Sequence, residues 1–130
     1  MQNKLHELHI ILYVSNQQKS KSFYEKLFNI TPVLDVEGMT EFNLLPNLKL
    51  GIMPESSIVK IFKNKTPDPS TGSKIPRCEL YLKVSKPLEY QEKAISLGAK
   101  LISAFAQRDW GDEVSYLADL DGHILAFVKS

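Results

Sequence analysis

The sequence predicts an α+β protein made of two tandem β-α-β-β-β modules, whose curved mixed sheets surround a cavity and carry their helices on the outer faces. The main evidence is an internal repeat. His9 and Glu79 each lie five residues before a Val-Ser pair, and in both places a β-rich run leads into an amphipathic helix pattern. A second observation is the Asp121-Gly122 turn between two β-rich runs, which is typical of a hairpin.

Length and composition set the broad class. The 130 residues suit a single domain over 1–130, with module one at about 6–53, a linker loop at about 54–77 and module two at about 78–130. Hydrophobic residues make up 43% of the chain and charged residues 24%, which is ordinary for a globular protein. The net charge of +1 gives no electrostatic basis for binding nucleic acid or an anionic membrane.

The location is expected to be cytoplasmic. Cys78 is the one cysteine, so it cannot form an intrachain disulfide, and the N-terminus lacks the pattern of a secretory signal peptide. No apolar run approaches the ~20 residues that a membrane-spanning helix requires. We therefore expect neither a membrane partner nor a spanning segment.

Module one begins with a strand over 8–14, where β-branched and aromatic residues predominate before a Ser-Asn turn. A helix over 17–28 is predicted next, because apolar and aromatic residues recur there at steps of three and four. Three short strands should follow, at about 33–36, 39–45 and 48–53, separated by Glu-Gly and Pro-Asn turns.

The segment 54–77 is predicted to be a long loop. It contains four prolines and carries five basic residues against two acidic ones. Loops of this length in compact domains usually form functional flaps, partner contacts or mobile linkers. A solvated connector between the two modules is the alternative.

Module two repeats the pattern of module one. A strand over 79–84 precedes a helix over 87–97, which Gly98 should end because glycine readily adopts the left-handed conformation. A strand over 100–105 and the hairpin over 110–128 complete the module.

Four short features, spread over nearly the whole chain, carry a resemblance to a known family. They are Leu8-His9, Ser22–Phe28, Gly98-Ala99 and Asp119–His123. In this order and spacing the sequence resembles the vicinal oxygen chelate superfamily, the group of glyoxalases, bleomycin-resistance proteins and extradiol dioxygenases. The resemblance implies paired β-α-β-β-β modules, but this fold hosts unrelated functions.

In the metal-dependent members of that family, the first and last strands of each module supply the ligands, typically His and Glu. The resemblance places the two first-strand positions on His9 and Glu79. The last-strand position of module two falls on Ala126, which cannot bind a metal. The corresponding position of module one is Gly51, or Met53 in a shifted register, and neither is a plausible ligand for a hard metal.

The histidines allow more than one interpretation. His9 and Glu79, brought together by the repeat, could hold a weakly bound metal or act as a general base. The alternative is a satisfied, partly buried His9, with Glu79 paired to Lys83, Lys49 or Arg77. His123 is expected to be a turn or surface residue, because its strand parity directs it away from the cavity side.

Strand alternation also assigns residues to the cavity side of the sheets. The ligand-binding candidates are His9, Tyr13, Lys49, Met53, Glu79, Tyr81, Arg108 and Trp110. Trp110 could cover a flat ligand by stacking, and Arg108 could bind an anionic group through two hydrogen bonds. A core or dimer anchor is the alternative role for Trp110.

The favoured function is that of the metal-free, bleomycin-resistance-like branch, namely a homodimer that binds a small aromatic or amphiphilic molecule and uses no cofactor. The loss of two of the four ligand positions motivates this hypothesis. A glyoxalase-like lyase or isomerase with a divalent metal at His9 and Glu79 is the alternative. A protein-interaction module that uses the basic loop is a third, less favoured hypothesis. The sequence contains no nucleophile elbow or phosphate-binding glycine loop, and no base adjoins Cys78.

Overall fold

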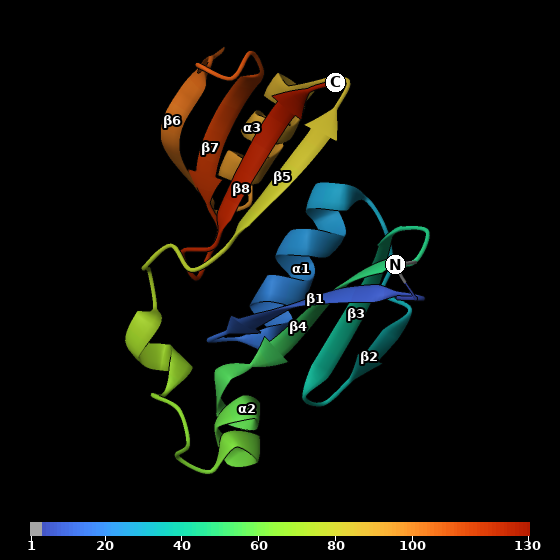
Figure 1. The fold of residues 1–130 in the computed structure, drawn as a ribbon, viewed down its shortest axis with the longest axis vertical. Helices are drawn as coiled ribbons and strands as arrows, with labels where there is room; N and C mark the ends of the chain where they lie inside the picture. The colour runs from blue at the N-terminus through green and yellow to red at the C-terminus, as the bar shows by residue number, and fades with distance from the viewer. Residues whose placement is uncertain (1–3) are drawn as a thin grey trace. The chain divides into compact units, whose positions relative to one another are not determined.

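The computed structural model of the protein describes residues 4–130 and divides the chain into two compact units (Figure 1). Unit 1 is Met1–Thr71 and unit 2 is Gly72–Ser130. Each unit contains a four-stranded mixed sheet built from a β-α-β-β-β segment. The predicted α+β class and the predicted repeat are therefore confirmed. The enclosed cavity between the two sheets stays a prediction.

The elements of unit 1 follow the predicted order. They are β1 Leu8–Val14, α1 Gln17–Phe28, β2 Leu34–Val36, β3 Met39–Leu45 and β4 Leu48–Pro54. In the sheet the strand order is β1-β4-β3-β2, with β1 parallel to β4 and the other pairs antiparallel. The first and last strands of the unit are therefore neighbours.

The ends of α1 are fixed by its flanking asparagines. The Asn16 side chain accepts a hydrogen bond from the Lys19 backbone amide at 2.9 Å, which satisfies one of the free N–H groups of the first turn. Asn29 has φ 52° and its amide bonds back to the Glu25 carbonyl, so the helix ends there as predicted. The helix bounds match the sequence prediction because both capping residues are local signals.

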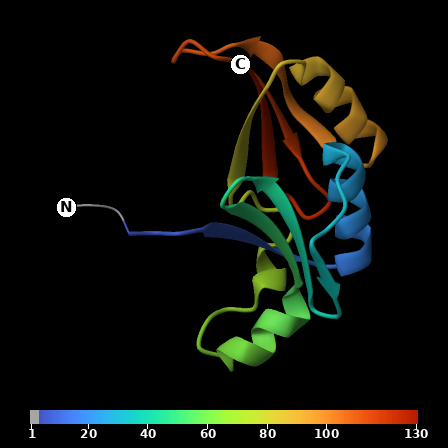
Figure 2. The same cartoon turned by 90° about the vertical axis from the view of Figure 1, so that its right-hand side faces the viewer.

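One face of the unit 1 sheet packs against α1 and forms the core (Figure 2). Strand alternation places the apolar rows on this face. The buried residues on it are Leu12, Val14, Phe42, Leu50 and Ile52, and α1 contributes Phe23, Tyr24 and Leu27. The predicted division into a helix-packing row and an opposite row is confirmed.

The predicted loop over 54–77 is wrong in its first part. Helix α2 spans Glu55–Phe62 and lies beyond the end of β4 (Figure 2). Two contacts stabilise this helix. Ile58 is buried, and the ring of Phe62 packs edge to face on Tyr13, with 6.5 Å between the ring centroids. A short 3₁₀ helix over Pro69–Gly72 follows. The high content of proline and hydroxyl residues masked a helix of only eight residues. No helix in residues 4–130 is long and apolar enough to span a membrane.

Unit 2 repeats the architecture of unit 1. Its elements are β5 Glu79–Val84, α3 Pro87–Ser96, β6 Lys100–Gln107, β7 Glu113–Ala118 and β8 Ile124–Lys129. The strand order is β5-β8-β7-β6, again with a parallel pair, β5 with β8, at one edge. Figure 1 shows α3 behind this sheet, where Tyr90 packs on Phe127 at 5.6 Å between ring centroids. Strand β6 runs two residues further than predicted.

The turn between β7 and β8 is locked by a distant segment of unit 2. Within the turn, the Asp119 carboxylate accepts hydrogen bonds at 2.9 Å from the amides of Asp121 and His123. The Lys74 backbone amide donates to the Asp121 carbonyl at 2.9 Å, so the segment before β5 lies across the turn. Gly122 has φ +95°, and a Cβ there would lie 2.6 Å from Lys74 Cα. Only glycine fits this position without a shift of the backbone.

The surface role considered for His123 is wrong, although the residue does lie in the turn. Its side chain is only 3% exposed, because the segment before β5 covers the turn. Its Nδ1 lies 3.6 Å from the sulfur of Cys78. Burial, with a further contribution from Asp119, raises the pKa of the Cys78 thiol. The thiol form is therefore favoured, which gives no support to a catalytic thiolate.

Candidate functional site

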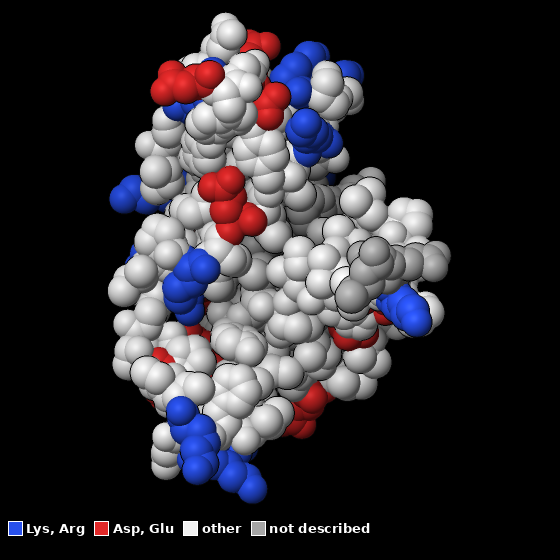
Figure 3. All heavy atoms as spheres, in the orientation of Figure 1, with Lys and Arg blue, Asp and Glu red and all other residues white. Residues whose placement is uncertain are grey.

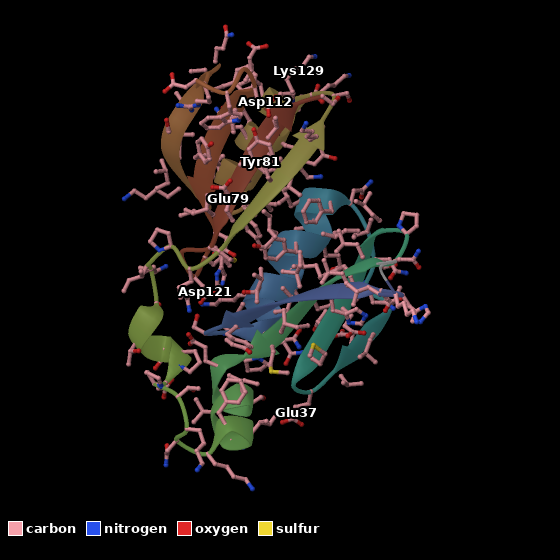
Figure 4. The ribbon with its side chains drawn as sticks, in the orientation of Figure 1. Glu37, Glu79, Tyr81, Asp112, Asp121 and Lys129 are labelled. Atoms are coloured by element: carbon pink, nitrogen blue, oxygen red, sulfur yellow. The ribbon has the colours of Figure 1, made fainter. Side chains whose placement is uncertain are left out.

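The face of the unit 2 sheet opposite α3 carries the aromatic candidates. We call it the open face of unit 2, and it is defined by strand register. On these three strands its members are Glu79, Tyr81 and Lys83 on β5, Val114, Tyr116 and Ala118 on β7, and Ile124, Ala126 and Val128 on β8. In this register Tyr81 and Tyr116 flank Ala126 from the two neighbouring strands. Figure 4 shows Glu79 and Tyr81 on the side of the sheet that faces the viewer.

A chain of hydrogen bonds fixes Trp110 to the open face. The indole Nε1 of Trp110 donates to the Tyr81 hydroxyl at 2.8 Å, and that hydroxyl donates to the Asp112 carboxylate at 2.6 Å. Trp110 and Asp112 both lie in the connection between β6 and β7, so the loop is tied to β5. The indole is nevertheless 60% exposed. A core anchor is therefore wrong for Trp110, and a ligand contact or a dimer contact remains.

The electrostatics of this chain keep Tyr81 protonated. Desolvation and the hydrogen bond to Asp112 raise the pKa of the Tyr81 hydroxyl, while the hydrogen bond from Trp110 lowers it. The net direction is upward, so at neutral pH the phenol remains a donor to Asp112 and an acceptor for Trp110. The Tyr81 hydroxyl can therefore keep both hydrogen bonds at neutral pH.

The guanidinium of Arg108 bonds to the backbone of its own unit. Its Nη2 donates to the carbonyls of Ala104 and Val114, each at 2.7 Å, and Nε donates to the Val114 carbonyl at 3.2 Å. Its Cζ lies 5.1 Å from the centroid of the Tyr116 ring, within cation–π range. Arg108 therefore clamps the ends of β6 and β7. That it also binds an anionic ligand stays a prediction.

The position where the family resemblance implies a carboxylate is closely packed with methyl groups. Ala126 forms a fully buried cluster with Val114 and Val128, and the Tyr116 ring packs against it. These side chains lie on the same face as the two tyrosines but are themselves fully buried. The aromatic surface that a ligand could reach on this face therefore includes Tyr81 and Trp110.

Charged groups surround this apolar region. Figure 3 shows acidic side chains scattered over the same view of unit 2, and Glu79 and Asp112 are labelled there in Figure 4. Among the six open-face residues of β5 and β7, Glu79 and Lys83 carry opposite formal charges. Aromatic and charged side chains therefore share this face.

In unit 1, His9 lies between two carboxylates. Its Nε2 contacts the Glu7 carboxylate, and its Nδ1 lies 3.4 Å from Glu41 Oε2. Lys49, which is opposite His9 in the β1–β4 pair, bonds to the same Glu7 oxygen at 3.0 Å. His9 therefore has partners for its ring, as one of the two interpretations expected, but it is exposed rather than partly buried. The pairing of Glu79 with a basic residue stays a prediction. The meeting of His9 with Glu79 across a cavity stays a prediction.

The other unit 1 candidates lie further along the same sheet face. Tyr13 and Met53 are opposite each other in the β1–β4 register. Between these residues and the His9–Lys49 pair, Ile11 lies opposite Gly51. A Cβ added to Gly51 would lie only 2.4 Å from the Cδ1 atom of Ile11, so the Ile11 side chain fills that space. Aliphatic packing therefore fills the position that corresponds to the last-strand ligand of module one.

Within residues 4–130, the side chains at the positions that the resemblance assigns to metal ligands do not supply a full set of donors. Gly51 and Ala126 have no donor atoms, and Glu7 and Glu41 contact opposite nitrogens of the His9 ring, so one ion could not bind both carboxylates together with a single ring nitrogen. Across residues 4–130 no group of three or more His, Cys, Asp or Glu side chains is arranged to hold a metal ion.

Sequence reasoning missed Glu7, Glu41 and Asp112. Strand alternation over 39–45 would have placed Glu41 on the same face as His9, because Glu41 is opposite Gly51 in the sheet. Asp112 carries a weaker signal, an acidic residue next to a Trp-Gly turn. Glu7 lies before the first strand and has no periodic pattern to mark it.

Comparison with known proteins gives one family and a consistent fold. The model of the family described as "Glyoxalase/Bleomycin resistance protein/Dioxygenase superfamily" matches residues 8–127. No curated protein matches the chain significantly.

Several solved structures share the fold. A glyoxalase-related enzyme from Fulvimarina pelagi has a TM-score of 0.79 at 19% identity, covering 98% of this chain and 89% of that chain. A glyoxalase/bleomycin resistance protein/dioxygenase family enzyme from Burkholderia phytofirmans PsJN has 0.76 at 12%, covering 93% and 95%. A glyoxalase/bleomycin resistance protein from Albidiferax ferrireducens T118 has 0.65 at 20%, covering 94% and 96%. At these identities the likeness shows the fold alone.

Proposed function

Because the chain belongs to the Glyoxalase/Bleomycin resistance protein/Dioxygenase superfamily, we propose that it is a cytoplasmic binding protein for a small aromatic or amphiphilic molecule and works without a metal ion. The observation that carries this proposal is the exposed side chain of Trp110, which a hydrogen bond holds to the partly exposed ring of Tyr81. An indole that is fixed in place loses little entropy when a flat ligand stacks on it.

The chemistry of the open face of unit 2 suits such a ligand. Tryptophan and tyrosine provide large contact areas and a polar handle, and both are enriched where small numbers of residues dominate binding. Tyr81 and Trp110 both expose part of their side chains on this face, and the Asp112 carboxylate can accept a hydrogen bond. A second copy of the chain would cover this face in the homodimer that we propose, which would remove the ligand from water.

The neutral fluorescent probe N-phenyl-1-naphthylamine tests the aromatic site. Trp110 is the single tryptophan of the chain, so energy transfer from tryptophan to the probe reports binding near this residue. We expect saturable binding to the native protein. Trp110→Ala should weaken probe binding, measured by the probe's own fluorescence, by at least about tenfold, as for a central aromatic anchor.

The matched control is Ile61→Ala, which removes an equally exposed apolar side chain from α2 in unit 1 and should leave probe binding unchanged. Equal affinity of the native protein and Trp110→Ala would refute the aromatic site. Sedimentation equilibrium on the same samples tests the homodimer, and a monomer at saturating probe would contradict that part of the proposal.

A metal-dependent lyase or isomerase is the competing function, and metal analysis separates the two. Protein purified without chelator is expected to contain divalent metal well below one equivalent, since the unit 1 donors are engaged with one another. Stoichiometric metal that is lost in His9→Ala, with the fold retained by circular dichroism, would overturn the metal-independent proposal.

A further inference from the structure

In unit 1 a carboxylate of the chain itself is held by two groups on paired strands. The Glu7 Oε2 atom contacts His9 Nε2 and Lys49 Nζ, and Lys49 lies 3.0 Å away. Glu7 belongs to the segment just before β1, whereas His9 and Lys49 are fixed opposite each other in the β1–β4 pair. The two donors therefore belong to the rigid sheet, and the acceptor comes from the segment that precedes it.

The backbone positions of the two donors are set by strand pairing and not by Glu7. Parallel pairing fixes the spacing of the His9 and Lys49 backbones, and both side chains leave the same face of the sheet. On the far side of the imidazole, Glu41 Oε2 lies 3.4 Å from Nδ1. A carboxylate at Nδ1 orients the ring and directs Nε2 toward a ligand, as outer partners of functional histidines do.

The Glu7 carboxylate lies in contact with both donors at this position. The hydrogen bonds from His9 and from Lys49, in that order of size, lower the pKa of the Glu7 carboxyl group below its ordinary value. The charged form is therefore favoured by the pair of donors. Any other carboxylate that reached the same two atoms would make the same two contacts.

Space for a larger ligand lies next to these donors. A surface hollow of about 510 Å³ includes Glu7 and Lys49 in its wall. The rest of the wall comes from the end of β3 and the turn before β4, namely Asn43, Leu44, Leu45, Pro46 and Asn47. The wall is mainly polar, and Leu45, which is 63% exposed, adds an apolar side chain beside the cationic group. The hollow can therefore hold the body of a small organic acid whose carboxylate reaches the two donors.

We propose that His9 and Lys49 form a binding site for the carboxylate of a small organic acid, and that Glu7 occupies this site when no acid is bound. The proposal is independent of the aromatic site in unit 2. The ligand class proposed for unit 1 is therefore small organic acids. Glu7 competes with them for His9 and Lys49, so an acid binds only when it displaces the Glu7 carboxylate.

The test uses benzoate as the probe and the neutral amide benzamide as its uncharged counterpart. Both are titrated at constant ionic strength and followed by the backbone amide signals of His9, Asn43 and Lys49 in two-dimensional NMR. Glu7→Ala should bind benzoate about three- to fivefold more tightly than the native protein, the range expected for removal of an exposed ion pair. Adding Lys49→Met to Glu7→Ala should abolish benzoate binding, and benzamide should not bind to any form.

Glu37→Ala is the matched control, because it removes the same charge from the turn between β2 and β3 (Figure 4). Its benzoate affinity should equal that of the native protein. The proposal is overturned if Glu7→Ala and Glu37→Ala bind benzoate equally, or if benzamide binds as well as benzoate. Benzoate shifts confined to unit 2 amides would also overturn it, while leaving the aromatic site proposed above in place.

Discussion

Gly122→Ala should lower the free energy of unfolding by about 3 to 4 kcal/mol, the upper range for single substitutions. Two costs combine at this position. An alanine with φ +95° adopts a conformation that L-residues disfavour. Its Cβ would also lie 2.6 Å from Lys74 Cα and 2.7 Å from the Lys74 carbonyl carbon, and neither atom can move without moving the backbone. Urea denaturation followed by circular dichroism measures the loss.

Gly111 provides the control that separates the two costs. Its φ is +100°, but a Cβ there would have no neighbouring atom within 4 Å. Gly111→Ala should therefore lose only the conformational cost of about 1 to 2 kcal/mol. If both variants lose the same free energy of unfolding, the segment around Lys74 can move away from the turn at little cost. The close contact between Gly122 and Lys74 would then not be what requires glycine at this position.

Arg108→Met is expected to lower the free energy of unfolding by about 2 to 3 kcal/mol, because it removes charge-assisted hydrogen bonds and leaves two carbonyl groups with fewer donors. These bonds reach the Ala104 and Val114 carbonyls, and Val114 is fully buried. The variant also removes the cation–π contact with Tyr116. Urea denaturation gives the difference directly.

Lys83→Met removes a cation from the same face of unit 2, but this side chain is exposed on β5. Its effect should stay within about 0.5 kcal/mol, as for surface substitutions in general. A stable Arg108→Met variant that binds the fluorescent probe less tightly would reverse the assignment. The guanidinium would then serve a ligand, as the sequence alone suggested.

The parts of the fold that depend on local signals could be predicted from the sequence. The bounds of β1, α1, β3 and β5 follow from alternation, periodicity and capping residues that act within a few positions of each other. Helix α2 was missed because its eight residues follow a proline and include two serines, which weaken the periodic signal. Its formation depends on the contact between Phe62 and Tyr13, a tertiary feature.

The candidate site was predictable only in part, for the same reason. Alternation placed Tyr81 and Ala126 on one face, and the register confirms it. The partners that define the chemistry come from distant positions. Asp112 is 31 residues from Tyr81, and Lys49 is 42 residues from Glu7. Side-chain pairings of this kind carry no periodic signature in the chain, so they require the folded structure.

The parallel pairing of β1 with β4 has a consequence for synthesis of the protein. Strand β1 leaves the ribosome before its partner β4, which begins at Leu48, after α1, β2 and β3 have been made. At a synthesis rate of about 5 to 20 residues per second, the edge of β1 that pairs with β4 stays unpaired for seconds. The same delay recurs between β5 and β8. Each unit therefore has a period during its synthesis when a nascent strand can pair wrongly, and that period closes only with the unit's last strand.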